Sequence, residues 1–316
     1  MRWLGAASAT SDPARTLGNA AFYIFVPALL FRTTARLDLA TMPWATVAAF
    51  FAPVLLLMLV VYAIERARTR GHRSRLVDVD ASERAAAAPS SRAIASTFGN
   101  SVQVGIPMVS ALWGEPALAI YVALISLHAL VLLSVLTTLV ELDLARARSR
   151  HEATASLAAT LRTTLRNTMI HPVVLPVIAG MAWKLTGWPL PGALDETLVL
   201  LATAVAPLCL VLIGISLAYY GIGRSAVASA ALVSLMKLVA LPALVLAVAY
   251  FGFGIRGLPL DVVVLMAALP TGSNALIFAQ RYRSQEAEAT TAIVLSTLGF
   301  IVTGPLWLAV LARLGG

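Results

Sequence analysis

Amide and hydroxyl side chains gather in two otherwise apolar stretches of the chain, residues 94–108 and 267–280. Each stretch also contains a proline, Pro107 or Pro270, which removes a backbone donor and frees a carbonyl oxygen. The side chains in these stretches that are able to bind a solute are Asn100, Ser101, Gln103, Thr271, Ser273 and Asn274. They form neither a metal-ligand cluster nor a nucleophile with its base, so they indicate binding of a polar solute rather than catalysis.

Broken helices would explain both stretches. A helix that breaks inside a membrane presents free N–H groups at one stub and free carbonyl groups at the other, and these ends attract anions and cations respectively. A single such cluster is equally well explained as hydrogen bonding between neighbouring helices. Two clusters at corresponding places favour a crossing of two broken helices, marked by Pro107 and Pro270, around a solute site.

Lys237 lies deep in an apolar segment, thirteen positions from both Arg224 and Tyr250. At 1.5 Å per helical residue it is about 20 Å from each of them, near the middle of a membrane span. A buried ammonium group is costly and usually faces a partner or a solute pathway. We expect Lys237 to act in or near an anion site, and the alternative is a structural lysine that binds carbonyl groups of a broken helix. His128, midway along another apolar segment, is expected to be a packing residue rather than a proton relay.

Composition identifies an all-α integral membrane protein, because 59% of residues are apolar, only 12% are charged and the mean hydropathy is +0.87. The net charge of +8 and the pI near 10.2 raise the alternative of nucleic-acid binding. The arginines, however, collect in two polar connections, 65–92 and 141–167, beside apolar segments. This pattern predicts that both connections are cytoplasmic loops of a multi-pass protein of the inner (plasma) membrane. The protein would then contact membrane lipid and would not bind nucleic acid.

Nine apolar segments are long enough to span a membrane, and they cover residues 17–37, 43–64, 93–113, 117–140, 169–188, 197–220, 226–251, 260–280 and 289–312. Prolines interrupt the first three in the same order as the sixth to eighth. Equivalent segments are five apart and therefore run in opposite directions, as in an inverted repeat. The sequence thus predicts a first repeat of four spans in 1–140, a basic cytoplasmic connection in 141–167, and a second repeat of five spans in 168–316.

Several strings together resemble the auxin efflux carrier family of PIN-like membrane transporters, in particular its bacterial malonate-carrier-like branch. They are FYIFVPALLF from Phe22, FGNSVQVGIPM from Phe98, MKLVALP from Met236, AALPTGSNALIFAQRY from Ala267 and STLGFIVTGPLW from Ser296. The resemblance implies ten spans in two inverted five-helix repeats, of which the first helix is missing here. It also implies a scaffold domain that dimerises, a transport domain and elevator-type movement of an organic anion. Asn100, Gln103 and Asn274 would then lie near the substrate, beside the crossover.

We therefore expect a secondary transporter of a small organic anion, a carboxylate such as malonate or an auxin-like acid. It would not be an enzyme and would use no cofactor or metal. The resemblance leaves a homodimer open. Two alternatives remain: a sodium-coupled bile-acid-type carrier, and a receptor or interaction module that keeps the fold without moving a solute.

Overall fold

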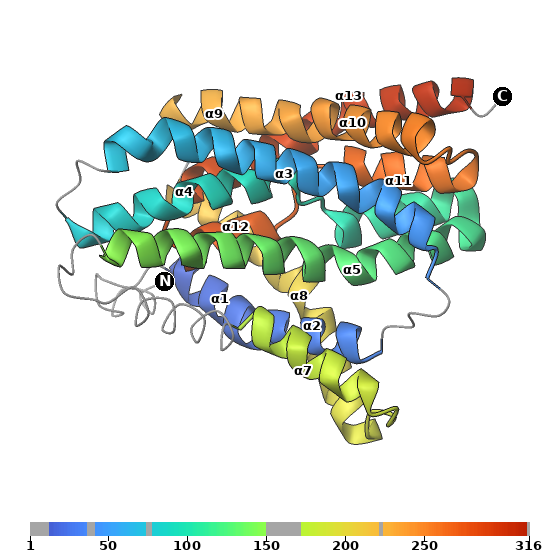
Figure 1. Cartoon of the computed structure of the whole chain (residues 1–316), viewed down its shortest axis with the longest axis horizontal. Coiled ribbons are helices and arrows are strands. Elements are labelled where there is room, and N and C mark those ends of the chain that lie inside the picture. The colour runs from blue at the N-terminus through green and yellow to red at the C-terminus, as the bar shows by residue number, and fades with distance from the viewer. Residues whose placement is uncertain (1–12, 37–41, 74–77, 150–171, 221–223, 315–316) are drawn as a thin grey trace, which may run out of the picture.

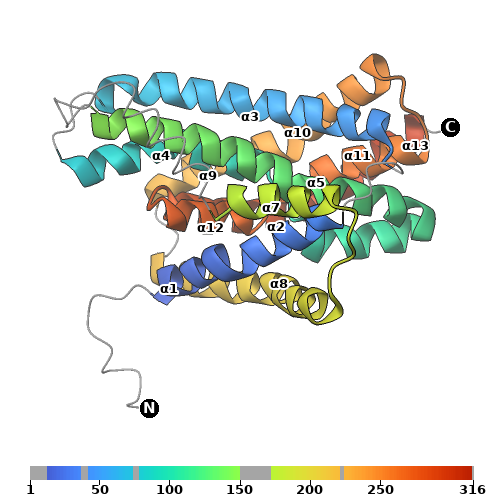
Figure 2. The same cartoon turned by 60° about the horizontal axis from the view of Figure 1, so that its bottom comes forward.

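The computed structural model describes residues 13–36, 42–73, 78–149, 172–220 and 224–314, and nearly all of them are helical. The helices form two groups (Figures 1 and 2). The small bundle consists of α1 (Pro13–Ala20), the π-helical turn η1 (Ala21–Phe25), α2 (Val26–Ala35), α7 (Val174–Leu185) and α8 (Gly192–Tyr220). The large bundle consists of α3 (Trp44–Arg73), α4 (Val79–Thr97), η2 (Ser101–Gly105), α5 (Ile106–Ser149), α9 (Arg224–Leu235), η3 (Met236–Ala240), α10 (Leu241–Ala247), η4 (Val248–Gly252), α11 (Leu258–Ala268), α12 (Asn274–Arg281) and α13 (Glu286–Leu314).

The two bundles contact each other along one boundary. Helices α1 and α8 of the small bundle contact α12 and α13 of the large one, while α2 and α7 contact α5. In Figure 1 the small bundle runs along the lower side of the molecule, beneath α5 and α12. Within the small bundle α2 and α7 pack closely, because Gly180 has no side chain to collide with the backbone oxygen of Phe31.

The apolar helices match a membrane protein. Within the described residues, four stretches are long and apolar enough to cross a membrane: Trp44–Thr69, Ser101–Arg148, Ala226–Gly252 and Glu286–Leu314. The second reverses direction at Gly114, whose φ of +68° suits glycine, so it contains two helices rather than one. Two shorter apolar helices, α7 and α11, accompany them. The nine spans and the inverted repeats stay predictions.

Three prolines bend their helices without breaking them. Pro27, Pro107 and Pro242 are each the second residue of an α-helix that directly follows a π-helical turn. In each case the residue before the proline donates its N–H to the carbonyl five positions back. A proline ring clashes with the carbonyl four positions back in an ordinary helix, and the wider turn relieves that clash.

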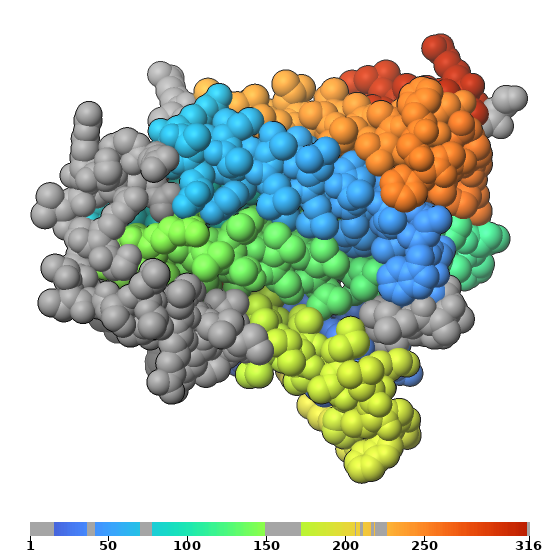
Figure 3. Space-filling model, in the orientation of Figure 1, coloured from blue at the N-terminus to red at the C-terminus, as the bar shows by residue number. Residues whose placement is uncertain are grey.

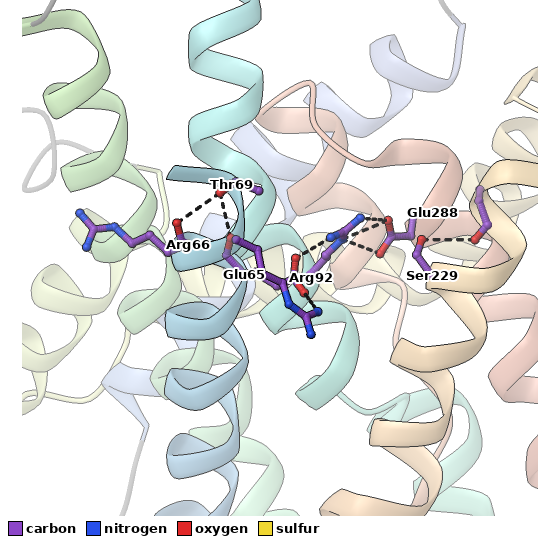
Figure 4. Close-up of polar contacts among 8 residues, drawn as sticks. Glu65, Arg66, Thr69, Arg92, Ser229 and Glu288 are labelled. Carbon is purple, nitrogen blue, oxygen red and sulfur yellow. Dashed lines mark hydrogen bonds and ion pairs between the residues drawn. The ribbon is translucent and has the colours of Figure 1, made fainter. Parts of the chain in front are cut away.

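The first polar connection, 65–92, is largely helical and not a loop. Helix α3 continues to Arg73, and α4 begins at Val79, capped by the Asp78 side chain, which accepts a hydrogen bond from the Ala81 N–H. Arg92 then joins three helices, because its guanidinium lies between the carboxylates of Glu65 and Glu288 (Figure 4). The second connection begins as the end of α5, and its residues 150–167 lie outside the described part of the chain.

Large apolar side chains are exposed on the outer faces of both bundles. On α13 the most exposed of these side chains are Leu298, Ile301, Val302 and Leu306. In the small bundle α7 and its connection to α8 project from the body (Figure 3), where Leu185 is 79% exposed and Trp188 71%. Such surfaces suit contact with lipid rather than water.

Candidate solute-binding site

Two broken helices cross inside the large bundle. The chain leaves helical geometry between α4 and η2 and again between α11 and α12, and the two breaks lie antiparallel. The Gly272 N–H donates to the Phe98 carbonyl and the Asn100 N–H donates to the Pro270 carbonyl, both at 2.8 Å. Each break therefore supplies partners for backbone groups that the other break has freed, which a dry interior requires.

Glycine, not Pro107, makes the crossing in the first of the two segments. The crossing residues are Gly99 and Thr271, and Pro107 lies eight positions farther along, in α5. A side chain on Gly272 would place its Cβ 2.7 Å from the Gly99 carbonyl oxygen, so the two backbones approach this closely only because residue 272 is a glycine. Pro270, by contrast, lies in the break itself.

The far side of the crossing is held by buried polar contacts within the large bundle. The Thr271 hydroxyl donates to the Ala95 carbonyl at 2.9 Å, and the Thr271 N–H donates to Ser296 Oγ at 3.0 Å. Lys237 Nζ donates to the Ala267 carbonyl at 2.5 Å, at the end of α11. Lys237 and Thr271 are fully buried and are not among the residues that line the adjacent cavity. The lysine contact is thus that of a structural residue at a broken helix end.

A cavity of about 410 Å³ lies on the other side of the crossing, at the boundary between the bundles. Helices α2 and α8 form one wall, and α5 and the two breaks form the other. The sequence-predicted residues that line it are Asn100, Ser101, Gln103, Ser273 and Asn274. The structure therefore brings together the amide and hydroxyl side chains of both stretches, with Thr271 as the exception.

Two polar atoms in the cavity wall have no hydrogen-bond partner among the described residues: Asn100 Oδ1 and His128 Nδ1. Asn100 is 9% exposed and His128 only 2%, so bulk solvent does not compensate them. The imidazole packs against the Phe98 ring, with 4.4 Å between ring centroids. Buried polar groups are rarely left unpaired, so these two atoms need partners that the described residues do not supply in this conformation.

Arg32 is a lining residue that the sequence analysis missed as a site residue. Among the described residues that line the cavity it is the only Lys, Arg, Asp or Glu. Its Nε donates to Asp195 Oδ1 at 2.8 Å, and Arg36 Nη1 donates to Asp195 Oδ2 at 2.8 Å. The hydrogen bond from Arg32 lowers the pKa of the Asp195 carboxyl below its ordinary value, so the pair is ionised at neutral pH. Only the fold reveals this pair, because its members lie 163 positions apart.

The crossing and the cavity have the chemistry of a solute site. Among the described residues, no three His, Cys, Asp or Glu side chains lie close enough to hold a metal ion. What the cavity offers instead is a guanidinium, amides and hydroxyls that bind without making or breaking covalent bonds.

Comparison with known proteins agrees with this reading. Residues 7–308 match the family model described as membrane transport protein. The chain is 32% identical over 126 residues to the "Uncharacterized transporter YfdV" of Escherichia coli (strain K12), a match that covers 40% of this chain and 39% of that protein. It is 29% identical over 143 residues to "Auxin efflux carrier component 3a" of Oryza sativa subsp. japonica, covering 44% of this chain and 22% of the rice protein.

The chain thus spans well under half the length of the curated relatives that it matches. The family match is far longer than either pairwise match and includes both breaks and the cavity between the bundles. It also agrees with the apolar helices. The chain belongs to the membrane transport protein family, the family of the auxin efflux carriers.

Proposed function

We propose that this protein is a secondary transporter that moves a small organic anion, a carboxylate such as malonate or an auxin-like acid, through the cavity beside the crossing. The observation that carries the proposal is the cavity wall itself. It combines the guanidinium of Arg32 with the side-chain amide of Asn100, whose –NH₂ group can donate hydrogen bonds. A carboxylate is the acceptor that such donors fit best.

The direction of the broken helices also favours an anion. Residues 101–103 begin the helix that continues into α5, and Asn274 begins α12, and all of these line the cavity. Two helix N-termini, with their free N–H groups and partial positive charge, therefore border the same space. The C-terminus of α11 lies on the opposite side, where Lys237 binds its Ala267 carbonyl. The partial negative charge at this helix end is thus offset by the Lys237 ammonium group.

The two-bundle arrangement supports alternating access by an elevator-type movement. The buried contacts of Thr271 and Lys237 tie the crossing to other parts of the large bundle. The small bundle contributes only the facing wall, through α2 and α8. A displacement of the large bundle along the small one would therefore carry the crossing and its solute together. Nine spans in two inverted repeats, and dimerisation through the small bundle, complete this proposal.

Counterflow in proteoliposomes tests the proposal. Vesicles that contain purified protein are loaded with unlabelled malonate, acetate or indole-3-acetate and diluted into the same labelled acid, with and without sodium. We expect exchange of at least one carboxylate, no exchange of its amide, and loss of exchange in Asn100→Ala. The absence of exchange for every carboxylate would contradict the proposal. Exchange that requires sodium but ignores the charge of the solute would favour the bile-acid-type carrier instead.

A further inference from the structure

Arg32 lies where two cavities adjoin. A second cavity, of about 750 Å³, shares Arg32, Thr33, Ile125 and Ser126 with the cavity at the crossing. From these shared residues it extends past Arg36. Arg32 therefore borders both cavities at the place where they adjoin.

At this junction Arg32 already holds a carboxylate, that of Asp195. Nε donates to Oδ1 at 2.8 Å and Nη2 donates to Oδ2 at 3.3 Å, which is the two-pronged arrangement that guanidinium and carboxylate groups prefer. These bonds use two of the five N–H groups of Arg32. The Arg32 side chain is 28% exposed and that of Asp195 is 23% exposed, so the pair is not sealed inside the protein. Arg32 borders both cavities, whereas Asp195 lines a third cavity beside Arg36.

We propose that Arg32 is the residue that selects carboxylates at this site, and that Asp195 is a built-in competitor that the carboxylate of an entering solute displaces. This inference rests on the proposed function and identifies the residue that distinguishes a charged solute from a neutral one. It predicts that Arg32 sets the preference for an acid over its neutral amide, and that Asp195 sets how tightly the acid binds.

The position of Arg36 makes the exchange chemically reasonable. Its Nη1 donates to Oδ2 of Asp195 at 2.8 Å. When a solute carboxylate takes the place of Asp195 on Arg32, Asp195 keeps a guanidinium partner and is not left as an isolated charge. One ion pair is then exchanged for another of the same chemistry, a change with a small difference in free energy.

Ligand-dependent thermal stability of the purified full chain provides the test, because a ligand that binds only the folded state raises the apparent Tm with its concentration. The probes are acetate, malonate, succinate and indole-3-acetate, each with its amide. We expect Arg32→Gln to weaken carboxylate binding about 10- to 100-fold, since bonds to charged groups are lost. Arg32→Lys keeps the positive charge but cannot form the two-pronged pair, so its carboxylate affinity should lie between those of the unmodified chain and Arg32→Gln. Asp195→Asn should tighten binding about two- to fivefold.

Arg148→Gln is the matched control. It removes the same charge from an exposed pair with Glu83, and Arg148 lines neither cavity, so we expect a change of less than about threefold. If the unmodified chain binds a carboxylate and Arg32→Gln binds it equally well, the inference is wrong while the proposed function stands. If Asp195→Asn weakens binding, Asp195 is not a competitor. If neither the unmodified chain nor Asp195→Asn binds any carboxylate, the proposed function fails and the inference fails with it.

Discussion

Replacing Arg92 with glutamine should destabilise the large bundle strongly. Arg92 forms a two-pronged pair with Glu288, with Nε to Oε1 at 3.0 Å and Nη2 to Oε2 at 3.1 Å, and its Nη1 lies 2.5 Å from Glu65 Oε2. The Glu288 side chain is only 5% exposed and that of Glu65 10%. The substitution would leave two nearly buried carboxylates without this partner, at the point where α3, α4 and α13 meet (Figure 4).

The expected loss follows from the burial of these groups. Removing one member of a buried ion pair costs about 3–5 kcal/mol, chiefly because a charge is left without compensation. The Arg92 side chain is 27% exposed, so water screens part of that charge, and we take the lower limit of about 3 kcal/mol. For a chain of this size that corresponds to a fall in apparent Tm of about 6–12 °C.

Thermal unfolding in detergent, followed by tryptophan fluorescence, measures this fall. The matched control is Arg148→Gln, because Arg148 pairs with Glu83 at 2.6 Å but the two side chains are 48% and 30% exposed. An exposed pair contributes about 0–1 kcal/mol, so the control should lose at most about 4 °C. Adding Glu288→Gln to the Arg92 variant should restore part of the loss, because it removes an uncompensated charge. Equal Tm values for the Arg92 and Arg148 variants would refute the reasoning.

Three further predictions concern the site. Gly272→Ala should abolish carboxylate binding and cost about 1–3 kcal/mol, because its Cβ would lie 2.7 Å from a backbone oxygen. Gly214→Ala, inside α8 with open space around it, should leave binding unchanged and should not lower the Tm. Thermal shift with and without ligand reports both effects. Thr271→Val should lower the free energy of unfolding by about 1–2 kcal/mol, since the Ala95 carbonyl loses its hydrogen-bond donor. An unchanged Tm would contradict this prediction. The pKa of Asp195 is lowered, so its ionised form is present above the ordinary carboxyl pKa of about 4 and is lost only as pH falls through the lowered value. The ratio of carboxylate affinities between Asp195→Asn and the unmodified chain should therefore be the same at pH 8 and pH 5, and a ratio that changes would contradict this assignment.

The sequence predicts the helical membrane class, and it also singles out the two polar stretches as candidates for solute binding, for a physical reason. In a chain with so few charges, amide and hydroxyl groups are unusual in long apolar segments and must find partners. Asn100 and Asn274 are therefore visible as candidates from the sequence, and the structure lines one cavity with both. Local chemistry of this kind does not depend on knowing which helices touch.

Other parts of the site depend on contacts between distant residues and were missed for that reason. The pairing of Arg32 with Asp195 joins α2 to α8, and neither residue is unusual at the end of a helix. Pro107 was expected to mark the crossing because proline removes a donor, but a π-helical turn accommodates the ring, and Gly99 makes the crossing instead. Lys237 was correctly placed deep in the protein, yet which group it binds depends on the end of α11.

The most direct test of the account is an experimental structure determined with the carboxylate that gives the strongest counterflow. The account predicts density for that acid in the cavity between the two bundles, within hydrogen-bond distance of Asn100 and of the guanidinium of Arg32, with Asp195 released to Arg36. Density outside this cavity, or on the Lys237 side of the crossing, would contradict it.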